Sequence, residues 1–491
     1  MRTYQDLVAV GEDDNKRAEF CREAINIFMA SKEYKEASDG EAYYAKHNLT
    51  IERFQKWLYT VSGRKVEDIF SANHKLKTLF FRRLVIQQVQ YILGNGVIMQ
   101  DDANKKKLGI DFDFKIQMAA KKAMAAGSSF LFWNLDHVEV FGFADTPRSP
   151  GFCPLYDEET AKLRAGIRYW FKTVGNKQIF RCTLYEADGY TSYRKAGSDP
   201  AVVDVAKRGY IQTVTKTDAN GIEDVTDDNY SDLPIIPMYA NDLMQTELFG
   251  VRENIDCYDL IKSGLMNNID DSNEIYWILQ NTGGMDDVDL ARFVQRMKTV
   301  RAAVVDGDDN AKAEAHTINI PVEARQKALE ILRRDIYEDF QALDVSTLSA
   351  AAKTTQEIQA AYQSQDNKCA DFEYYVLNSI EKVLSIAGID DIPTLQWNKI
   401  INQSELVTMI LQAAQYLTDD MIIKLLPFLT PEQADEIIQQ REASEYNSFE
   451  GEGEEGEDEG IDDEERAMQD GVLAELEALL AELDEGEGDE Q

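Results

Sequence analysis

Apolar positions along the chain follow two different periods. From Asn73 to Leu93 they recur every three or four residues and end at Gly94-Asn95-Gly96, which predicts a helix with a left-handed stop, in a mostly helical region 1–125. From residue 128 to 240, short aromatic and β-branched runs take over. The runs IRYWFKTV, KQIFRCTLYEA and YTSYRK, separated by turn dipeptides, predict a three-stranded meander. We therefore expect a mainly helical α+β protein with one β-rich section.

Helical periodicity returns after residue 244. It predicts a long helix over 245–275, about 46 Å in length, and further helices over 321–343 and 354–387. The insert 276–320 reads as the strands EIYWILQ and TVRAAVV, the helix DVDLARFVQRMK and the return strand HTINI. Residues 344–353 interrupt the helical pattern with Asp, Ser and Thr, which favour turns and caps.

Length and charge restrict the class of protein. The chain has 491 residues and 51 Lys and Arg against 89 Asp and Glu, a formal net charge of −38. Residues 441–491 contain 22 of the acidic residues and only two of the basic ones, and we expect the tail 446–491 to be largely disordered.

The charge disfavours a nucleic-acid reader with a basic face, and no apolar run is long enough for a membrane helix. Five scattered cysteines fit folding in a reducing cytoplasm.

Motifs for enzymatic chemistry are missing. The sequence has no phosphate-binding P-loop, no dinucleotide-binding glycine fingerprint and no nucleophile elbow. Its four histidines are not spaced as metal ligands, so we predict no catalytic residues, no cofactor and no metal. Two alternatives stay open: a metal-dependent nuclease using acidic pairs such as Asp308 and Asp309, and an acidic scaffold or DNA-mimic protein acting through its tail.

A family resemblance rests on four segments. LFGVRENIDCYDLIKSGLMNNIDDSNEIYWIL, INIPVEARQKALEILRRDIYEDFQALDVS and AAAKTTQEIQAAYQSQDNKCADFEYYVLNSIEKVL follow one another, and ANHKLKTLFFRRLVIQQVQYILGNGV precedes them. Together they resemble the portal proteins of tailed double-stranded-DNA bacteriophages, most of all the siphovirus type of Gram-positive hosts. The resemblance covers roughly residues 40–440 and includes the order helix, insert, helix, loop, helix.

The resemblance implies a ring, usually of twelve subunits, at one vertex of the virion head, assembled in the host cytoplasm. Double-stranded DNA passes through its channel during packaging and ejection. The implied partners are the terminase large subunit, later the head–tail adaptor, and the major capsid and scaffold proteins, with no membrane. The implied parts are a wing (1–244, joined by the returning helix in 354–400), stem helices (245–275 and 321–343), a clip (276–320), a tunnel loop (344–353), a crown (401–445) and the tail.

The resemblance also assigns residues. The DNA-facing residues of the tunnel loop are Asp344, Val345, Ser346, Thr347, Leu348, Ser349 and Lys353. Lys262 is a candidate channel-lining cation of the first stem helix, and the partner-docking residues of the clip are Asp286, Asp287, Asp306, Asp308 and Asp309. One departure from the family concerns the loop: no glycine occurs between Gly307 and Gly388, and Ser-Ala-Ala-Ala stands where a glycine is common.

Overall fold

The structure, a computed structural model, divides into two units, residues 1–399 and 400–491. In the first unit it describes residues 1–59, 64–68, 71–144, 149–175, 177–197, 201–216, 223–272, 276–280, 312–316, 321–347 and 355–398. In the second unit it describes residues 410, 416–426, 433–435 and 437–441.

The N-terminal part of the first unit is built from short helices. They are α1 (Tyr4–Val10), α2 (Asp14–Ala30), α3 (Lys32–Tyr44), α4 (Leu49–Arg53), α5 (Phe80–Leu93), α6 (Asp102–Lys106) and α7 (Phe112–Ala126). The side chains of Thr3, Asp13, Ser31 and Asn48 each accept a backbone N–H from the first turn of the following helix. These caps fix where the first four helices begin. Between α4 and α7 lie the hairpin of β1 (Trp57–Tyr59) and β2 (Lys65–Glu67) and the short strand β3 (Val97–Ile98).

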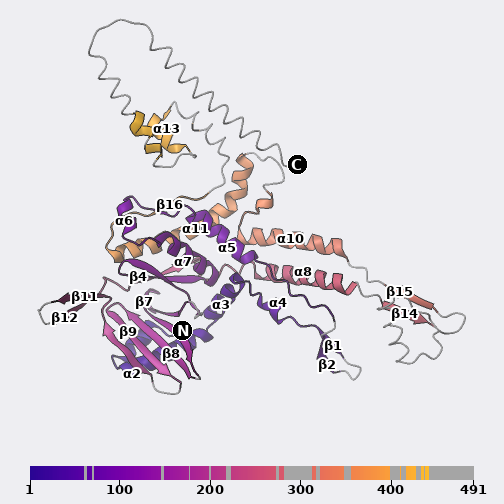
Figure 1. Cartoon of the computed structure of the whole chain (residues 1–491), viewed down its shortest axis with the longest axis horizontal. Helices are drawn as coiled ribbons and strands as arrows, with labels where there is room; N and C mark the ends of the chain where they lie inside the picture. Colours follow the sequence, from indigo (N-terminus) through magenta and orange to yellow (C-terminus); the bar gives the residue numbers. More distant parts are fainter. Residues whose placement is uncertain are drawn as a thin grey trace, which may run out of the picture. The chain divides into compact units, whose positions relative to one another are not determined.

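The β-rich section forms two larger antiparallel sheets and a hairpin (Figure 1). The five-stranded sheet has the order β10-β9-β8-β7-β6, and its strands are β6 (Gly151–Tyr156), β7 (Leu163–Val174), β8 (Lys177–Glu186), β9 (Gly189–Ala196) and β10 (Val202–Arg208). The three-stranded sheet has the order β13-β4-β5, from β4 (Ser128–Asn134), β5 (His137–Phe141) and β13 (Ile235–Tyr239). The separate hairpin pairs β11 (Ile211–Lys216) with β12 (Glu223–Asp228).

The predicted meander is confirmed as β7, β8 and β9. Tyr169, Cys182 and Tyr193 lie opposite one another across these three strands, and all three are buried. Paired residues share one face of a sheet, so this face points into the core.

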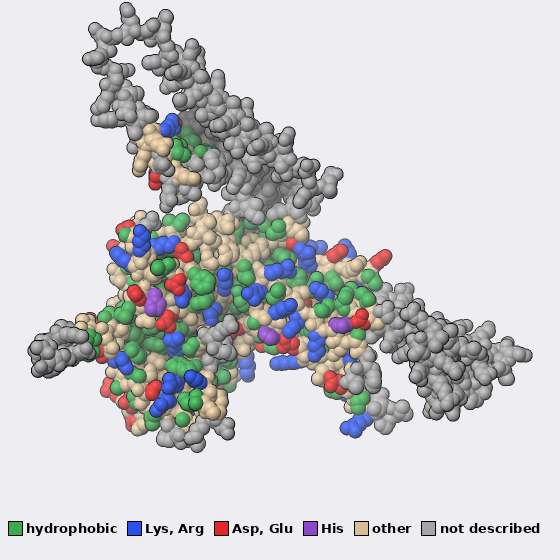
Figure 2. Space-filling view, viewed as in Figure 1, with side chains coloured by type: hydrophobic (Ala, Val, Ile, Leu, Met, Phe, Trp, Pro, Cys, Tyr) green, Lys and Arg blue, Asp and Glu red, His purple; other side chains and the backbone are tan. Residues whose placement is uncertain are grey.

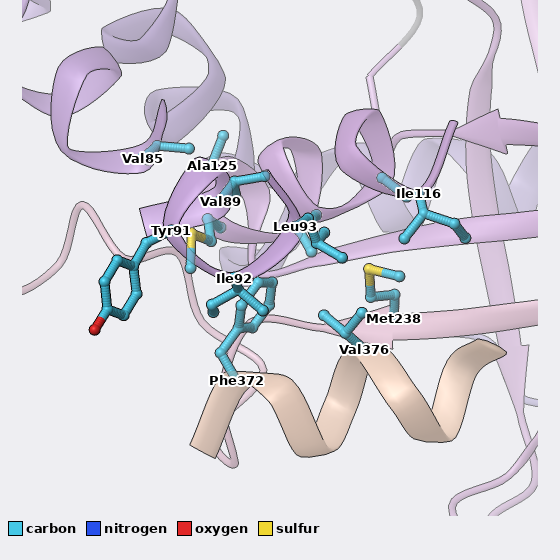
Figure 3. Packing of buried hydrophobic residues seen from close by; sticks show 14 of the residues in the cluster. Val85, Val89, Tyr91, Ile92, Leu93, Ile116, Ala125, Met238, Phe372 and Val376 are labelled. Atoms are coloured by element: carbon cyan, nitrogen blue, oxygen red, sulfur yellow. The ribbon is translucent and has the colours of Figure 1, made fainter. Parts of the chain in front are cut away.

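Two buried apolar clusters hold the first unit together. In the cluster of Figure 3, Val89 and Ile92 of α5 and Ile116 of α7 pack with Met238 of β13 and Val376 of a later helix, α11 (Thr355–Ala387). A chain segment some 280 residues away thus completes the core around α5. The second cluster lies between α2 and the sheets.

Two further long helices lie side by side (Figure 1). They are α8 (Arg252–Ser272) and α10 (Val322–Phe340), with 21 and 19 residues, or about 32 and 28 Å. The prediction for the first was too long, because residues 247–251 form turns before the helix begins: Thr246 accepts the backbone N–H of Leu248, and Val251 donates to the Leu248 carbonyl. The third helix, α11, has 33 residues and lies within its predicted bounds.

The insert between α8 and α10 is described only at its two ends. Strand β14 (Tyr276–Gln280) pairs antiparallel with β15 (Lys312–His316), which brings the ends of α8 and α10 to the same hairpin. The return strand was predicted at HTINI, but the strand comprises residues 312–316 and shares only His316 with it. The predicted strand TVRAAVV and helix DVDLARFVQRMK lie outside the described residues.

Residue 393 onward adds one short strand and the second unit. Strand β16 (Thr394–Leu395) pairs with β3. In the second unit, α13 (Asp419–Leu425) supplies Ile423 to a small apolar cluster with Ala434 and Ile438. The predicted disorder of 446–491 falls outside the described residues.

Candidate functional site: the α8–α10 pair and the loop after it

An extended strap, residues 73–78, runs along α8. Sequence periodicity placed these residues in a helix, and that prediction was wrong, because α5 begins only at Phe80. The backbone N–H groups of His74, Leu76 and Thr78 donate instead to α8 side chains. Alternate N–H groups pointing the same way are typical of extended backbone, so the strap is held as a single strand-like layer against the helix.

The acceptors on α8 form a buried polar stripe. Asn267 accepts from His74 at 2.6 Å, Ser263 from Leu76 at 3.0 Å and Asp259 from Thr78 at 3.1 Å. These three side chains are 4%, 6% and 0% exposed. They recur every four residues, which places them on one face of the helix. The spacing is visible in the sequence, beside the apolar stripe of the same helix.

Asp259 is the centre of this contact. Its second oxygen accepts from the Asn48 amide at 2.9 Å and from Thr78 at 3.3 Å. Burial raises the pKa of the Asp259 carboxyl, and the hydrogen bonds from Thr78 and Asn48 act in the opposite direction. The carboxylate therefore ties the strap, the start of α4 and α8 together.

The two helices are not covered on every side by described residues. Along α10, only Ile336 and Phe340 are buried, both near its C-terminal end. Toward the other end, Ile331 is 42% exposed and Val322 is 37% exposed, and Ile269 near the end of α8 is 40% exposed. Apolar side chains thus remain open to solvent where the helix pair leaves the body of the unit.

A short turn follows α10 and carries four of the seven predicted tunnel-loop residues. Asp344 precedes the 3-10 turn Val345–Thr347 and accepts from both the backbone and the hydroxyl of Ser346, at 3.1 and 2.8 Å. Arg333 of α10 pairs with Asp344 at 2.9 Å and also donates to the Ser346 hydroxyl. Burial works against ionisation of Asp344, but hydrogen bonds from Ser346 and Arg333 prevail and lower its pKa. The beginning of the loop is therefore fastened to α10.

The root of the loop is anchored from two other helices, α5 and α11. Leu343 is buried, its carbonyl accepts from Gln87 of α5 at 2.9 Å, and its N–H donates to Gln365 of α11 at 3.2 Å. Lys368 of α11 donates to the carbonyl of Phe340 at 2.8 Å and pairs with Glu247 at 2.5 Å. A cation at a helix C-terminus satisfies a free carbonyl and complements the helix dipole. The C-terminal end of α10, where the loop begins, is thus fixed to α5 and α11.

Lys262 lies on α8 beside an aromatic cluster. Its ammonium is 5.9 Å from the ring centroid of Tyr258, whose ring lies edge-on to Phe80 at 5.0 Å. Phe80 in turn lies edge-on to Tyr337 of α10 at 6.3 Å. Lys262 is half-buried and forms no ion pair with any described residue.

Protein-family comparison matches residues 29–447 to the family described as phage portal protein, SPP1 Gp6-like. The chain belongs to this family. The resemblance inferred from the sequence is thereby confirmed. The match includes α8, the insert, α10, the turn at 344–347 and α11.

Two curated portal proteins are similar to this portal-family chain. The portal protein of Clostridium phage phiCD119 is 24% identical over 383 residues, which cover 74% of this chain and 81% of the relative. The portal protein of Bacillus phage SPP1 is 23% identical over 315 residues, covering 62% of this chain and 60% of the relative. The chain thus spans less than two thirds of the Bacillus phage protein.

Two solved structures also match. A chain from the neck of an empty gene transfer agent particle matches with a TM-score of 0.40 and 10% identity, covering 71% of this chain and 90% of that chain. A chain from the virion of a native gene transfer agent particle matches with a TM-score of 0.39 and 8% identity, covering 70% and 87%.

The residues assigned to the portal functions are only partly described. Asp344, Val345, Ser346 and Thr347 lie together in the turn after α10. Leu348, Ser349, Lys353 and all five predicted clip residues, Asp286, Asp287, Asp306, Asp308 and Asp309, lie outside the described residues. The roles of these residues and of Lys262 stay predictions. In the part of the chain that is described, no group of three or more His, Cys, Asp or Glu side chains is placed to hold a metal ion, and no helix is long and apolar enough to cross a membrane.

Proposed function

We propose that this chain forms the portal ring of a phage head, as a non-enzymatic conduit for DNA during packaging and ejection. Family membership supports the portal function, and the exposed apolar residues of α8 and α10 support assembly into a ring. Long helices with uncovered apolar positions are stabilised when neighbouring copies pack against them.

We assign the parts of the portal to the observed elements. The stem is α8 with α10, and the clip is the insert 276–320 between them. The wing comprises 1–244 with the returning helix α11, the tunnel loop is 344–353, and the crown begins at residue 401. The antiparallel hairpin β14–β15 supports the clip assignment, because it joins the two stem helices at one end.

We propose that the tunnel loop faces the DNA, through the residues from Asp344 to Ser349 and Lys353, and that Lys262 lines the channel. Figure 2 shows acidic and basic side chains interspersed over the α8–α10 pair. A mixed surface suits a conduit, because a continuous basic wall would bind phosphates and hold the duplex in place. With a net charge of −38, the chain as a whole repels DNA at short range.

The proposed partners follow from the portal position. A twelve-fold ring at the head vertex contacts the major capsid and scaffold proteins. The clip docks the terminase large subunit during packaging and the head–tail adaptor afterwards. Acidic residues in the clip, Asp286, Asp287, Asp306, Asp308 and Asp309, suit basic partner surfaces, which would increase encounter rates and selectivity.

Electron microscopy of the purified full-length chain tests the proposal. We expect ring-shaped class averages with one rotational symmetry and an open centre. We also expect no DNA cleavage with magnesium, and ring formation should survive deletion of 446–491. A chain that stays monomeric at micromolar concentration at every salt concentration would contradict the portal function. Metal-dependent cleavage lost on changing Asp308 and Asp309 would favour the nuclease instead.

A further inference from the structure

An acidic groove of about 550 Å³ opens beside the C-terminal end of α10. Three aspartates line it together with Glu247: Asp339 of α10, Asp371 of α11 and Asp242 of the turn after β13. Among described residues, none of the three forms an ion pair, although Asp339 accepts one hydrogen bond from Asn254 at 2.7 Å. The lining also includes Lys368, but its charge is already matched by Glu247. The groove therefore presents unmatched negative charge.

A buried amide in the same groove has no nitrogen or oxygen hydrogen-bond partner among the described residues. Gln88 of α5 is 2% exposed and lines the groove, yet neither its amide oxygen nor its nitrogen is hydrogen-bonded within the described structure. The Cys369 thiol lies beside it, but a thiol is too weak a partner to satisfy an amide. A buried polar group left unpaired costs about 1–3 kcal/mol, so a partner from outside the subunit would relieve that cost.

The rim of the groove has the composition of a protein interface. Tyr374, 66% exposed, and Tyr375 lie edge-on at 5.4 Å and line the groove. Exposed tyrosines around a polar centre are typical of residues that contribute most to protein binding. Burial, and then the nearby charges of Asp242 and Asp371, raise the pKa of Tyr375.

Two unpaired arginines lie at the start of α5. Arg82 and Arg83 are exposed and form no ion pair with described residues. Each is held against an aromatic ring, Arg82 at 5.4 Å from the centroid of Tyr44 and Arg83 at 5.0 Å from that of Phe80. Stacking orders a long side chain before it binds, which reduces the entropy lost on association.

The arginines and the groove lie at separate places around the end of α10. Phe80, beneath Arg83, contacts α10 at Tyr337. The acidic groove contacts α10 at Asp339, two residues further along, which is about 200° around a helix with 3.6 residues per turn. Complementary surfaces at separate places on one subunit allow head-to-tail contact, in which each copy uses one surface for each neighbour.

We propose that Arg82 and Arg83 of one copy dock into the acidic groove of the next, and that this contact joins the subunits of the ring. The guanidinium groups would pair with Asp242, Asp339 and Asp371 of the neighbour and donate to the Gln88 amide oxygen. This inference rests on the proposed portal function and names the second copy of the chain as the partner.

Charge reversal on either surface tests the contact in the full-length chain. We expect Arg83→Glu and Asp371→Lys each to raise the concentration needed for ring formation about tenfold or more, as measured by sedimentation, because like charges then face each other. The matched control is Lys16→Glu on α2, where the lysine is 69% exposed and, among described residues, pairs with Asp13 alone. This control should assemble like the wild type.

Mixing the two variants gives the sharpest result. In a ring where the two variants alternate, one kind of junction keeps Arg83 facing Asp371, and the other has both charges reversed. Opposite charges therefore meet at every junction, so an equimolar mixture should assemble although neither variant does alone. Gln88→Leu should also weaken the ring while leaving the thermal stability of the dissociated chain equal or higher, because it removes an unpaired amide. If Gln88 had only a structural role, Gln88→Leu would lower that thermal stability.

Each other outcome has one meaning. If the wild type and both variants form rings equally well, this inference fails while the portal function stands. If the wild type forms no ring, the portal function itself fails. If Arg83→Glu leaves the ring intact but weakens DNA retention, the arginines face DNA and the inference is overturned.

Discussion

Replacing Asp259 with alanine should release the strap from α8. The change removes the acceptor for the Thr78 N–H and for the Asn48 amide. Each buried donor left unpaired costs about 1–3 kcal/mol. Part of this cost is offset, because the variant no longer has to bury a carboxyl group, whose pKa burial raises in the wild type. We therefore expect a net loss of about 2 kcal/mol, which acts on the strap more than on the rest of the unit.

Hydrogen exchange of peptides covering 73–79 measures this loss directly. Since 1.4 kcal/mol corresponds to a factor of ten, strap amides should exchange about 30-fold faster in Asp259→Ala than in the wild type. Asp259→Asn should give a smaller increase, because its amide oxygen still accepts from Thr78 while its NH₂ group faces the donor of Asn48. Peptides from the β7–β8–β9 meander serve as an internal reference.

The control variant is Glu253→Gln on the same helix. Glu253 is exposed and lies in the first turn of α8, away from the strap. It should change strap exchange by less than about twofold. Unchanged exchange at 73–79 in Asp259→Ala would show that the three α8 acceptors do not hold the strap, and the account of why α5 begins at Phe80 would fail with it.

Two further predictions concern the end of α10. Lys368→Met should lower the free energy of unfolding in denaturant by about 3 kcal/mol, because it leaves the largely buried Glu247 carboxylate unpaired, and adding Glu247→Gln should recover more than half of that loss. Asp344→Asn should make the turn at 345–347 exchange about fivefold faster at pH 7. Because the folded-state pKa of Asp344 is lowered, its contribution is present above the ordinary carboxyl pKa and is lost as pH falls through the lowered value. The difference between the wild type and Asp344→Asn should therefore disappear in acid, and a constant difference would refute the role of ionised Asp344.

The elements that the sequence predicted well are those whose own local pattern is strong. The meander β7–β8–β9 has short connections, and alternation along each strand sets its buried face. Helix α11 has a long apolar stripe and a glycine, Gly388, just beyond its end. In both cases the local pattern and the tertiary environment favour the same structure.

The strap shows where local pattern fails. Leu76 and Leu79 continue the apolar spacing of α5, so periodicity extended the helix to Asn73. The backbone there is bound by Asp259, Ser263 and Asn267, which lie about 190 residues away. The spacing of Leu76 and Leu79 does not indicate a hydrogen-bonding partner at that distance in the sequence. The polar repeat on α8 is the one sequence feature that points to this contact.

The candidate site divides in the same way. The position of the loop after α10 followed from local turn chemistry, since Asp344 and Ser346 bond to each other. The anchors of its root did not, because Gln87, Gln365 and Lys368 come from other helices and bind through contacts that no local pattern records. The acidic groove was likewise invisible among so many acidic residues, since only the fold shows which carboxylates lack a cation.

Burial along α10 decreases from one end of the helix to the other, and this gradient favours assembly. Ile336 and Phe340 are fully covered by the body of the unit, while Ile331 and Val322 are more than a third exposed. The amphipathic pattern nevertheless continues through the whole helix. An amphipathic pattern indicates that one face of a helix is buried, but it does not indicate which partner buries it. A neighbouring copy of the chain is the simplest partner for the uncovered half of α10. The tip of the pair should therefore lose exposure only in the ring, and protection of 322–331 from hydrogen exchange should appear together with ring formation.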